Sequence, residues 1–411
     1  MLFGCCLIQF GGTGVLANCI GIFFPPVCQE LGFSTGEISL HITIRGVFTV
    51  LFLPIAGKLI TKIKLRYLLT AAVLMLSVSI GSMAFFSSLY QWYIASIFYG
   101  IGGAFLFLTV CPIILTNWFM DKAGLAIGIA MSFSGLGGVI MNPLGTWFIA
   151  VYGWRATYLM FAVVGAACML PATLFILKFT PQESGIKPYV NHGRSVSTAP
   201  QSPVAFDKSI WDVMRSPVFW LLMPVILIIA FMTVYAFHFP QYALSIQLSP
   251  AAGAAMVSAS MAANIVGKLG LGWLSKKYTS KITTLIGTAI TAAGFACIWL
   301  FPSVLPVLIA GSFLYGICMA MTGVSIPLLV SELFGHKNYA MILSIASMAT
   351  SLIGGVGMAL VGFLYDISGS YTLCFAVAII SCLVLVLLIN RIYRLQPVIK
   401  YAPVALSDLK N

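Results

Sequence analysis

Charged residues are scarce in this sequence. Only 7% of its 411 residues are Asp, Glu, Lys or Arg, whereas 61% are apolar, and the mean hydropathy is +1.06. One water-soluble fold cannot hide that much apolar surface, so this composition excludes a soluble globular protein. It indicates a protein whose solvent is the lipid bilayer.

The signatures of enzymes and of cofactor sites are also missing. No GxSxG, HExxH or P-loop motif occurs, and the partial GxGxxG from Gly270 neither follows a strand pattern nor opens a helix. The ten cysteines form no CxxC pair, so we interpret them as small apolar packing residues. The net charge of +12 comes without a basic arm or domain, which disfavours a nucleic-acid partner. We therefore expect no enzymatic activity, no cofactor and no metal.

What the sequence has in abundance is long apolar runs. A run of about 20 residues crosses the roughly 30 Å hydrocarbon core as a helix, and barrel strands are disfavoured because these runs do not alternate polar and apolar residues. The twelve predicted spans are Leu2 to Phe24, Glu37 to Ile60, Tyr67 to Phe86, Gln91 to Thr116, Ala123 to Ala150, Ala156 to Leu177, Pro217 to Pro240, Pro250 to Leu274, Thr283 to Phe301, Val304 to Ser331, Asn338 to Leu364 and Tyr371 to Ile392. The expected fold class is an all-α integral membrane protein with 12 transmembrane helices.

One long polar segment divides the series into six helices and six. Residues 179–216 are rich in Pro, Ser, Gly and charge, as flexible linkers are. The halves resemble each other, since FYGIGGAF from Phe98 has its counterpart in LYGICMAM from Leu314. Six spans return the chain to the same side, so the halves are parallel repeats. The predicted domains are an N-terminal six-helix bundle (1–178), a cytoplasmic linker (179–216), a C-terminal six-helix bundle (217–395) and a cytoplasmic tail (396–411).

Basic residues set the expected orientation. Of the 21 Lys and Arg, 18 fall on the side of the linker, and the exceptions are Arg45, Arg155 and Lys268. By the positive-inside rule the linker and both termini face the cytoplasm, which predicts a multi-pass protein of the plasma or inner membrane. The first span begins at the second residue without a basic flank or cleavage motif, so we do not expect a signal peptide.

Two cations lie deep inside predicted spans. Lys268 is about 12 Å from the Lys276 end of its helix. Arg45 is about 12 Å inside its own span, on a polar stripe with Glu37 and His41. A cation at that depth costs at least roughly 2.5–3.5 kcal/mol, so both side chains should face protein or water rather than lipid.

No fixed carboxylate is expected at the same depth. All nine acidic residues fall in predicted loops or at span ends. An unpaired deep cation is satisfied most directly by an anion that comes and goes, which makes Lys268 and Arg45 candidate substrate ligands. The alternative is structural, with Lys268 snorkelling along its helix and Arg45 bonded to backbone carbonyls.

The chain also resembles a known family. Residues 117–161 contain a WF pair, a basic loop, a Gly-rich helix and GWR in that order. This pattern is similar to the loop and fifth helix of major facilitator transporters in the monocarboxylate and oxalate/formate branches. Further matches are FFPPVCQELGFSTGEISL in the first external loop, SPVFWLL at the entry to helix seven and GFLYDISGSY in the turn between helices 11 and 12. The resemblance covers nearly the whole chain and implies the major facilitator fold and a transport function.

In that branch, helix eight often carries an Asp and an Arg four residues apart that line the translocation path. This sequence is similar at Asn264 and Lys268, with both positions altered. Lysine keeps the charge that pairs with a carboxylate but lacks the fork of arginine, and Asn264 cannot bind and release a proton. His41 and His238 remain as proton-coupling candidates, because histidine titrates near physiological pH, although either can also be a satisfied structural residue.

Two further features bear on the substrate: a second deep cation that dicarboxylate carriers share, and additional polar residues within the spans. Dicarboxylate carriers resemble one another in a second cation on helix eleven, but no Lys or Arg occurs between Lys337 and Arg391, which disfavours oxalate. Polar and aromatic residues within spans are further candidate substrate contacts, each with an equal structural explanation: Tyr99, Asn142, Tyr235 and Tyr315.

The cytoplasmic gating loops resemble the superfamily's motif A in altered form. The candidate gating residues are Gly57, Lys58 and Arg66 in the first half and Lys276 and Lys277 in the second. Thr61 stands where an Asp is usual, so the acid-based cytoplasmic latch of the family is absent or supplied by other residues.

These observations predict a secondary active transporter of a small organic anion, a monocarboxylate, by rocker-switch alternating access. Its partners are the anion, a coupling proton or counter-anion, and the bilayer, and its functional unit is a monomer. One alternative is efflux of apolar compounds, which predicts that neutralising Lys268 spares transport. Another is a membrane anion receptor, although a linker of 38 residues and a tail of 19 leave no room for a signalling domain.

Overall fold

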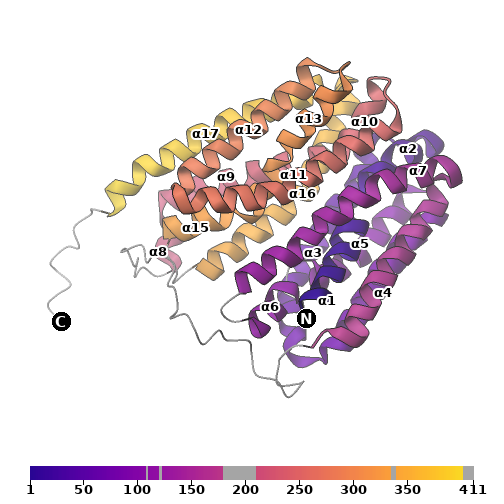
Figure 1. Ribbon diagram of the computed structural model, residues 1–411, viewed down its shortest axis with the longest axis horizontal. Helices are drawn as coiled ribbons and strands as arrows, with labels where there is room; N and C mark the ends of the chain where they lie inside the picture. Colours follow the sequence, from indigo (N-terminus) through magenta and orange to yellow (C-terminus); the bar gives the residue numbers. More distant parts are fainter. Residues whose placement is uncertain (108–109, 120–122, 179–209, 335–338, 401–411) are drawn as a thin grey trace.

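The computed structural model describes residues 1–107, 110–119, 123–178, 210–334 and 339–400. Every regular element in these ranges is a helix (Figure 1). The first half contains α1 (Leu2–Ile8), η1 (Gln9–Ala17), η2 (Ile20–Phe23), α2 (Phe24–Leu31), α3 (Thr35–Lys62), α4 (Leu65–Ser82), η3 (Met83–Phe85), α5 (Leu89–Leu106), α6 (Val110–Trp118), α7 (Ala123–Pro171) and η5 (Ala172–Ile176). The second half contains α8 (Ile210–Arg215), α9 (Pro217–Met232), α10 (Tyr235–Ser245), α11 (Pro250–Lys277), α12 (Ser280–Leu300), α13 (Leu305–Tyr315), α14 (Ile317–Gly323), α15 (Ser325–Phe334), α16 (Tyr339–Ser368) and α17 (Thr372–Lys400).

The described helices account for twelve membrane crossings. Eleven segments are long and apolar enough to cross a bilayer, and one of these, Ala126–Ile176, has 51 residues, more than twice the length that one crossing needs. Within it, α7 turns at Gly153, whose φ of 81° and ψ of 165° are not helical and suit glycine. This segment therefore crosses twice, and the predicted all-α fold class is confirmed.

The first, seventh and tenth crossings are broken helices. The first contains the π-helix η1 and the 3₁₀-helix η2, the seventh divides into α9 and α10, and the tenth divides into α13, α14 and α15. Interrupted helices in transporters supply irregular backbone where it lines the path, so the site is expected next to them.

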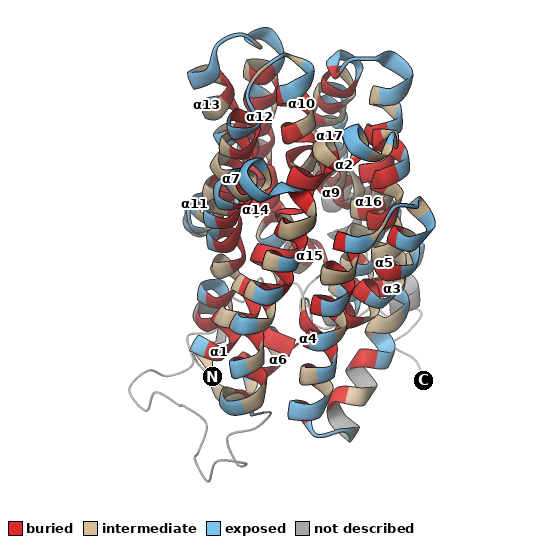
Figure 2. Cartoon of the chain, turned by 90° about the vertical axis from the view of Figure 1, so that its right-hand side faces the viewer, coloured by how far each residue is buried: buried red, intermediate tan, exposed pale blue. Residues whose placement is uncertain are grey.

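The bundle has two distinct ends. We call the end where η5 and α8 flank residues 179–209 the linker end, and the opposite end, with the turns that follow α2, α10 and α12, the far end (Figure 2). Side-chain caps start the helices at both ends. Ser34 and Glu37 form a reciprocal capping box at the far-end start of α3, and Thr279 accepts from the Ile282 N–H at the linker-end start of α12.

The two halves meet mainly along two helix pairs, α3 with α16 and α7 with α11, and α10 also contacts η2 and α2. The Thr43 hydroxyl donates to the Gly355 carbonyl at 2.7 Å, and the Ser258 hydroxyl donates to the Val139 carbonyl at 3.2 Å. Close to the far end, the two carboxylate oxygens of Asp366 accept from the start of α3. These contacts all lie in the far halves of their helices, so the far end is closed in this structure.

Nearer the linker end the same helix pair exposes large apolar side chains. On α3, Leu51 and Ile55 are 58% and 43% exposed, and on α16, Met348 and Leu352 are 39% and 45% exposed. Among the described residues, the hydrogen bonds between α3 and α16 thus lie in the far halves of the two helices.

Candidate functional site

Arg45 lies against Tyr99 where α3 packs on α5. The Arg45 Cζ is 5.3 Å from the centre of the Tyr99 ring, within the range of a cation–π contact. The Thr49 hydroxyl lies 2.9 Å from the Arg45 carbonyl oxygen and 3.0 Å from that of Gly100. Glycine permits this approach, because a Cβ at position 100 would lie only 2.5 Å from the Arg45 carbonyl oxygen. The sequence thus fixes α3 on α5 at the level of the predicted cation.

The polar atoms of this pair are available to a ligand. Within the described part of the chain, the Arg45 Nη1 and the Tyr99 hydroxyl are buried and have no hydrogen-bond partner. A buried polar group left without a partner costs about 1–3 kcal/mol. A ligand that accepted a hydrogen bond from either atom would remove that cost.

Lys268 and Asn264 lie one turn apart on α11. Lys268 is half-buried, and its Cε lies 3.6 Å from where a Cβ at Gly323 would be. Gly323 ends α14, and Val324 leaves helical geometry at φ −120° and ψ −55°, so the lysine stem runs beside the break in the tenth crossing. Asn264 is buried, and its Oδ1 has no partner among the described residues.

The described carboxylates lie at helix ends, where they form ion pairs or accept hydrogen bonds. In the described ranges the ion pair is between Glu30 and Arg155. The other carboxylate contacts are Glu30 with the Trp154 Nε1–H, Glu37 with the Ser34 N–H, Glu332 with the Ser280 N–H, and Asp366 with the Thr35 and Gly36 N–H groups. Neither Arg45 nor Lys268 therefore has a carboxylate partner within the part that the structure describes.

His41 and His238 contact the same aromatic residue from opposite halves. Their ring centres are 6.0 Å and 6.2 Å from that of Phe24, at the closed far end. His41 Nδ1 contacts the Ile38 carbonyl oxygen, whereas His41 Nε2 is buried without a described partner. His238 Nε2 lies 3.1 Å from the Met358 carbonyl oxygen. The structure thus brings the two proton-coupling candidates together around Phe24.

The remaining candidate contacts differ in how their polar atoms are used. Asn142 donates from Nδ2 to the Gly138 carbonyl at 2.7 Å, and its buried Oδ1 has no described partner. The Tyr235 hydroxyl donates to the Cys374 carbonyl at 2.7 Å. The Tyr315 hydroxyl accepts from the Ala236 N–H and lies within 3.0 Å of two carbonyl oxygens at the end of α9. Both tyrosine hydroxyls are therefore engaged by backbone inside the second half.

The gating candidates at the linker end are described only in part. Arg66 lies over the Phe175 ring at 5.9 Å, and Lys277 lies over the Trp273 ring at 5.3 Å. The surroundings of Gly57 and the side chains of Lys58 and Lys276 lie outside the described part of the structure.

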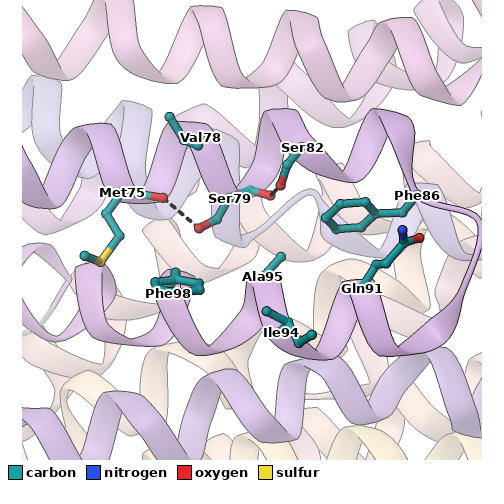
Figure 3. A pocket seen from close by; sticks show the side chains of 9 residues that line it. All are labelled: Met75, Val78, Ser79, Ser82, Phe86, Gln91, Ile94, Ala95 and Phe98. Atoms are coloured by element: carbon teal, nitrogen blue, oxygen red, sulfur yellow. Dashed lines mark hydrogen bonds between the residues drawn. The ribbon is translucent and has the colours of Figure 1, made fainter.

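A pocket of about 430 Å³ lies between α4 and α5, but it has no feature of a transport site (Figure 3). Its serine hydroxyls are used locally, since Ser79 donates to the Met75 carbonyl and Ser82 donates to the Ser79 carbonyl. Its lining residues are Met75, Val78, Ser79, Ser82, Phe86, Gln91, Ile94, Ala95 and Phe98. Val78 and Ile94 are 66% and 57% exposed, so the pocket belongs to the outer, lipid-facing surface.

Broken helices in a membrane bundle, together with two deep cations that have no carboxylate partner among the described residues, are features of secondary transporters. A family profile described as Major Facilitator Superfamily matches residues 2–279 and 239–406, which together cover nearly the whole chain. The chain belongs to the major facilitator superfamily. It is therefore a secondary transporter and not an enzyme.

This superfamily member has distant relatives among monocarboxylate transporters. It is 23% identical to Monocarboxylate transporter 12 of Mus musculus over 427 residues, covering 96% of this chain and 86% of the relative. It is 24% identical to Monocarboxylate transporter 13 of Rattus norvegicus over 374 residues, covering 89% and 82%. It is 27% identical to the uncharacterized MFS-type transporter YhjX of Escherichia coli (strain K12) over 326 residues, covering 77% and 74%. The resemblance inferred from the motifs is confirmed.

Solved transporters share the fold at low identity. The nucleoside transporter NupG superposes with a TM-score of 0.72 and 13% identity, covering 96% of this chain and 98% of NupG. An inward-facing, unoccupied bacterial homolog of the human lysosomal transporter Spinster superposes with a TM-score of 0.66 and 14% identity, covering 96% and 95%. These superpositions show the major facilitator fold alone.

Sequence reasoning missed Phe24, Gly323 and Asp366. Phe24 and Gly323 are apolar or small residues in apolar runs, and nothing in their own surroundings marks them. Asp366 lies in the middle of the GFLYDISGSY match, so the acid could be seen in the sequence, but its partners on α3 became apparent only from the packing of α16 beside α3.

Proposed function

We propose that this transporter moves a small organic anion, a monocarboxylate, by rocker-switch alternating access. The observation that carries the proposal is the pair of deep cations, Arg45 in the first half and Lys268 in the second, which have no carboxylate partner in the described residues. A carboxylate that moves between water and the bundle can neutralise such a cation, whereas an apolar compound cannot. The names of the distant relatives support the same substrate class.

The free polar atoms suggest a division of roles. Lys268 and Arg45 would pair with the carboxylate, and Asn264, Tyr99 and Asn142 would supply the remaining hydrogen bonds, since each has an unused buried atom among the described residues.

The two other tyrosines have contacts that favour a structural role. The hydroxyls of Tyr235 and Tyr315 already bind backbone groups, so we assign these side chains to holding the second half together rather than to the substrate.

The coupling and orientation follow from the same proposal. Proton symport would use His41 or His238, whose rings flank Phe24 at the closed far end, and exchange with a second anion would need neither. The linker end faces the cytoplasm of a plasma or inner membrane, and the functional unit is one chain, since the proposed ligands come from both of its halves.

Uptake into proteoliposomes tests the proposal. Labelled lactate, pyruvate, formate and acetate would be offered with and without a pH gradient or an internal anion, to the wild type, to Lys268→Gln and to Lys268→Arg. Losing one charged hydrogen bond, about 1.5–3 kcal/mol, corresponds to a rise in KM of about tenfold or more for Lys268→Gln. Lys268→Arg should recover part of the affinity because it keeps the charge.

Lys64→Gln is the matched control, because it removes the same charge at the linker end, where Lys64 is exposed at the start of α4. It should leave KM within about twofold of the wild type, since exposed charges contribute little. If none of the four acids is transported, the monocarboxylate assignment fails. If an acid is transported equally well by Lys268→Gln, the lysine is a structural residue, and the dependence on the gradient separates symport from exchange.

A further inference from the structure

The carboxylate of Asp366 joins the two halves of the transporter at the far end. Asp366 stands near the end of α16 in the second half, and α3 in the first half begins beside it. Its Oδ1 accepts from the Thr35 N–H at 3.2 Å, and its Oδ2 accepts from the Gly36 N–H at 2.7 Å. One side chain of the second half therefore binds two backbone donors at the start of α3.

These two donors are the ones that the cap of α3 leaves unused. The first N–H groups of a helix have no partner within it, and the aligned peptides give that end a partial positive charge. Ser34 accepts from the Glu37 N–H, and the Glu37 carboxylate accepts from the Ser34 N–H, so this reciprocal pair lies within the first half. Asp366, which belongs to the second half, accepts hydrogen bonds from the two N–H groups of α3 that this cap does not use.

Glycine brings the two backbones close enough for this contact. A Cβ at Gly362, one turn before Asp366, would lie 2.9 Å from the Gly36 Cα. A Cβ at Gly36 would overlap the Phe363 ring. The start of α3 and the end of α16 therefore meet backbone to backbone, and the carboxylate has a fixed distance to span.

The other helix pair between the halves, α7 with α11, has no described carboxylate contact of this kind at the far end. There the start of α11 is capped by its own Ser249, which accepts from the Ala252 N–H, and α7 turns at Gly153, which has no side chain. Among the described residues, the carboxylate contact across the far end is thus confined to the α3–α16 side.

We propose that Asp366 is the far-end gating residue of this transporter. Its carboxylate holds the far end closed by binding the start of α3, and it must release the Thr35 and Gly36 N–H groups each time that end opens. The inference rests on the proposed alternating access but not on the identity of the anion, because no substrate contact enters it.

Chemical modification of the native Cys28 thiol can measure how readily the far end opens. Cys28 is half-buried on α2, and its Sγ lies 3.9 Å from the Ser34 carbonyl oxygen, beside the first turn of α3. The full-length protein in lipid nanodiscs would be treated with a hydrophilic maleimide, and peptide mass spectrometry would follow the modification of Cys28 without substrate. Asp366 and Glu37 both act electrostatically on this thiol, so the rate with a bulky maleimide is divided by the rate with N-ethylmaleimide, in which that effect cancels. Separation of α3 from α16 should raise this corrected rate.

Asp366→Asn should label Cys28 about tenfold faster than the wild type, because asparagine keeps one acceptor oxygen without its charge and turns an NH2 donor toward the other backbone N–H, which loses its acceptor. Asp366→Glu keeps the charge and should restore part of the slow rate. Glu37→Gln is the matched control: it neutralises a carboxylate at the same helix end, but one whose contact stays within the first half, so its rate should remain within about twofold of the wild type.

Thermal unfolding of each variant distinguishes an effect on gating from a general loss of stability. A faster rate in Asp366→Asn with an unfolding midpoint near that of the wild type supports a gate, whereas an equal fall of the midpoint in Asp366→Asn and Asp366→Glu would mark a structural residue and overturn the proposal. The proposal is also overturned if Asp366→Asn labels at the wild-type rate or if Glu37→Gln labels as fast. These outcomes require no transported anion, so they stand apart from a failure of the monocarboxylate assignment.

Discussion

Gly100→Ala tests whether the contact between α3 and α5 positions Arg45. A Cβ at position 100 would lie 2.5 Å from the Arg45 carbonyl oxygen, 3.0 Å from the Phe48 Cβ and 3.2 Å from the Thr49 nitrogen. None of these atoms can rotate away, because each is backbone or attached directly to it. Ordinary contact begins near 3.4 Å, so the helices would have to separate by about 0.9 Å.

That separation has two expected effects. Overpacking should lower the free energy of unfolding by about 1–3 kcal/mol, and the Thr49 hydroxyl, now 3.0 Å from the Gly100 carbonyl oxygen, should lose that contact. Because Arg45 moves with α3, the KM for the transported anion should rise. Thermal unfolding of the purified protein and uptake into proteoliposomes measure the two effects.

Gly128→Ala is the control for the change of residue type. A Cβ at Gly128 meets nothing within 4 Å, so alanine there should be neutral or stabilise the helix by up to about 1 kcal/mol. If Gly100→Ala unfolds at the same temperature as Gly128→Ala and keeps the wild-type KM, then the close approach of α3 to α5 does not position the cation, and the reasoning is wrong.

Replacing Tyr235 or Tyr99 by Phe should have different effects, because the two hydroxyls have different surroundings. Tyr235→Phe should lower stability by about 0.5–1.5 kcal/mol through the lost bond to the Cys374 carbonyl and leave KM unchanged, whereas Tyr99→Phe should raise KM with little loss of stability, because its hydroxyl has no described partner. Uptake and thermal unfolding of both variants check this, and the reverse pattern would contradict it. Glu30→Gln should lower stability by at most about 1 kcal/mol through its ion pair with Arg155, since both side chains are roughly half exposed, and melts at low and high salt measure it.

The crossings could be predicted from sequence because apolar length is read directly from the chain. Their ends were less certain. The first span was predicted to end at Phe24, ahead of Pro25 and Pro26, but α2 begins at Phe24, has both prolines in its first turn and continues to Leu31. Proline is tolerated at the first positions of a helix, where its missing N–H is not needed, so the pair starts a helix in this protein rather than ending one.

Sequence alone could predict only those site residues whose type and depth in the membrane already mark them. Deep cations are costly wherever they fold, so Arg45 and Lys268 were visible as candidates from their depth alone. Tyr99 and Tyr315 looked alike in sequence, because they occupy equivalent positions in the predicted repeats. Their hydroxyls differ through the neighbouring backbone, since carbonyl groups at the end of α9 bind the Tyr315 hydroxyl and no described backbone group binds that of Tyr99. Such contacts depend on packing between distant segments.

The breaks in the first, seventh and tenth crossings have a mechanical consequence. A continuous helix such as α12 is stiff, so either end can move only if the whole helix tilts. A crossing made of two shorter helices, such as α9 and α10, can bend at its joint while few backbone hydrogen bonds change. A change of shape in this bundle should therefore cost least at these joints.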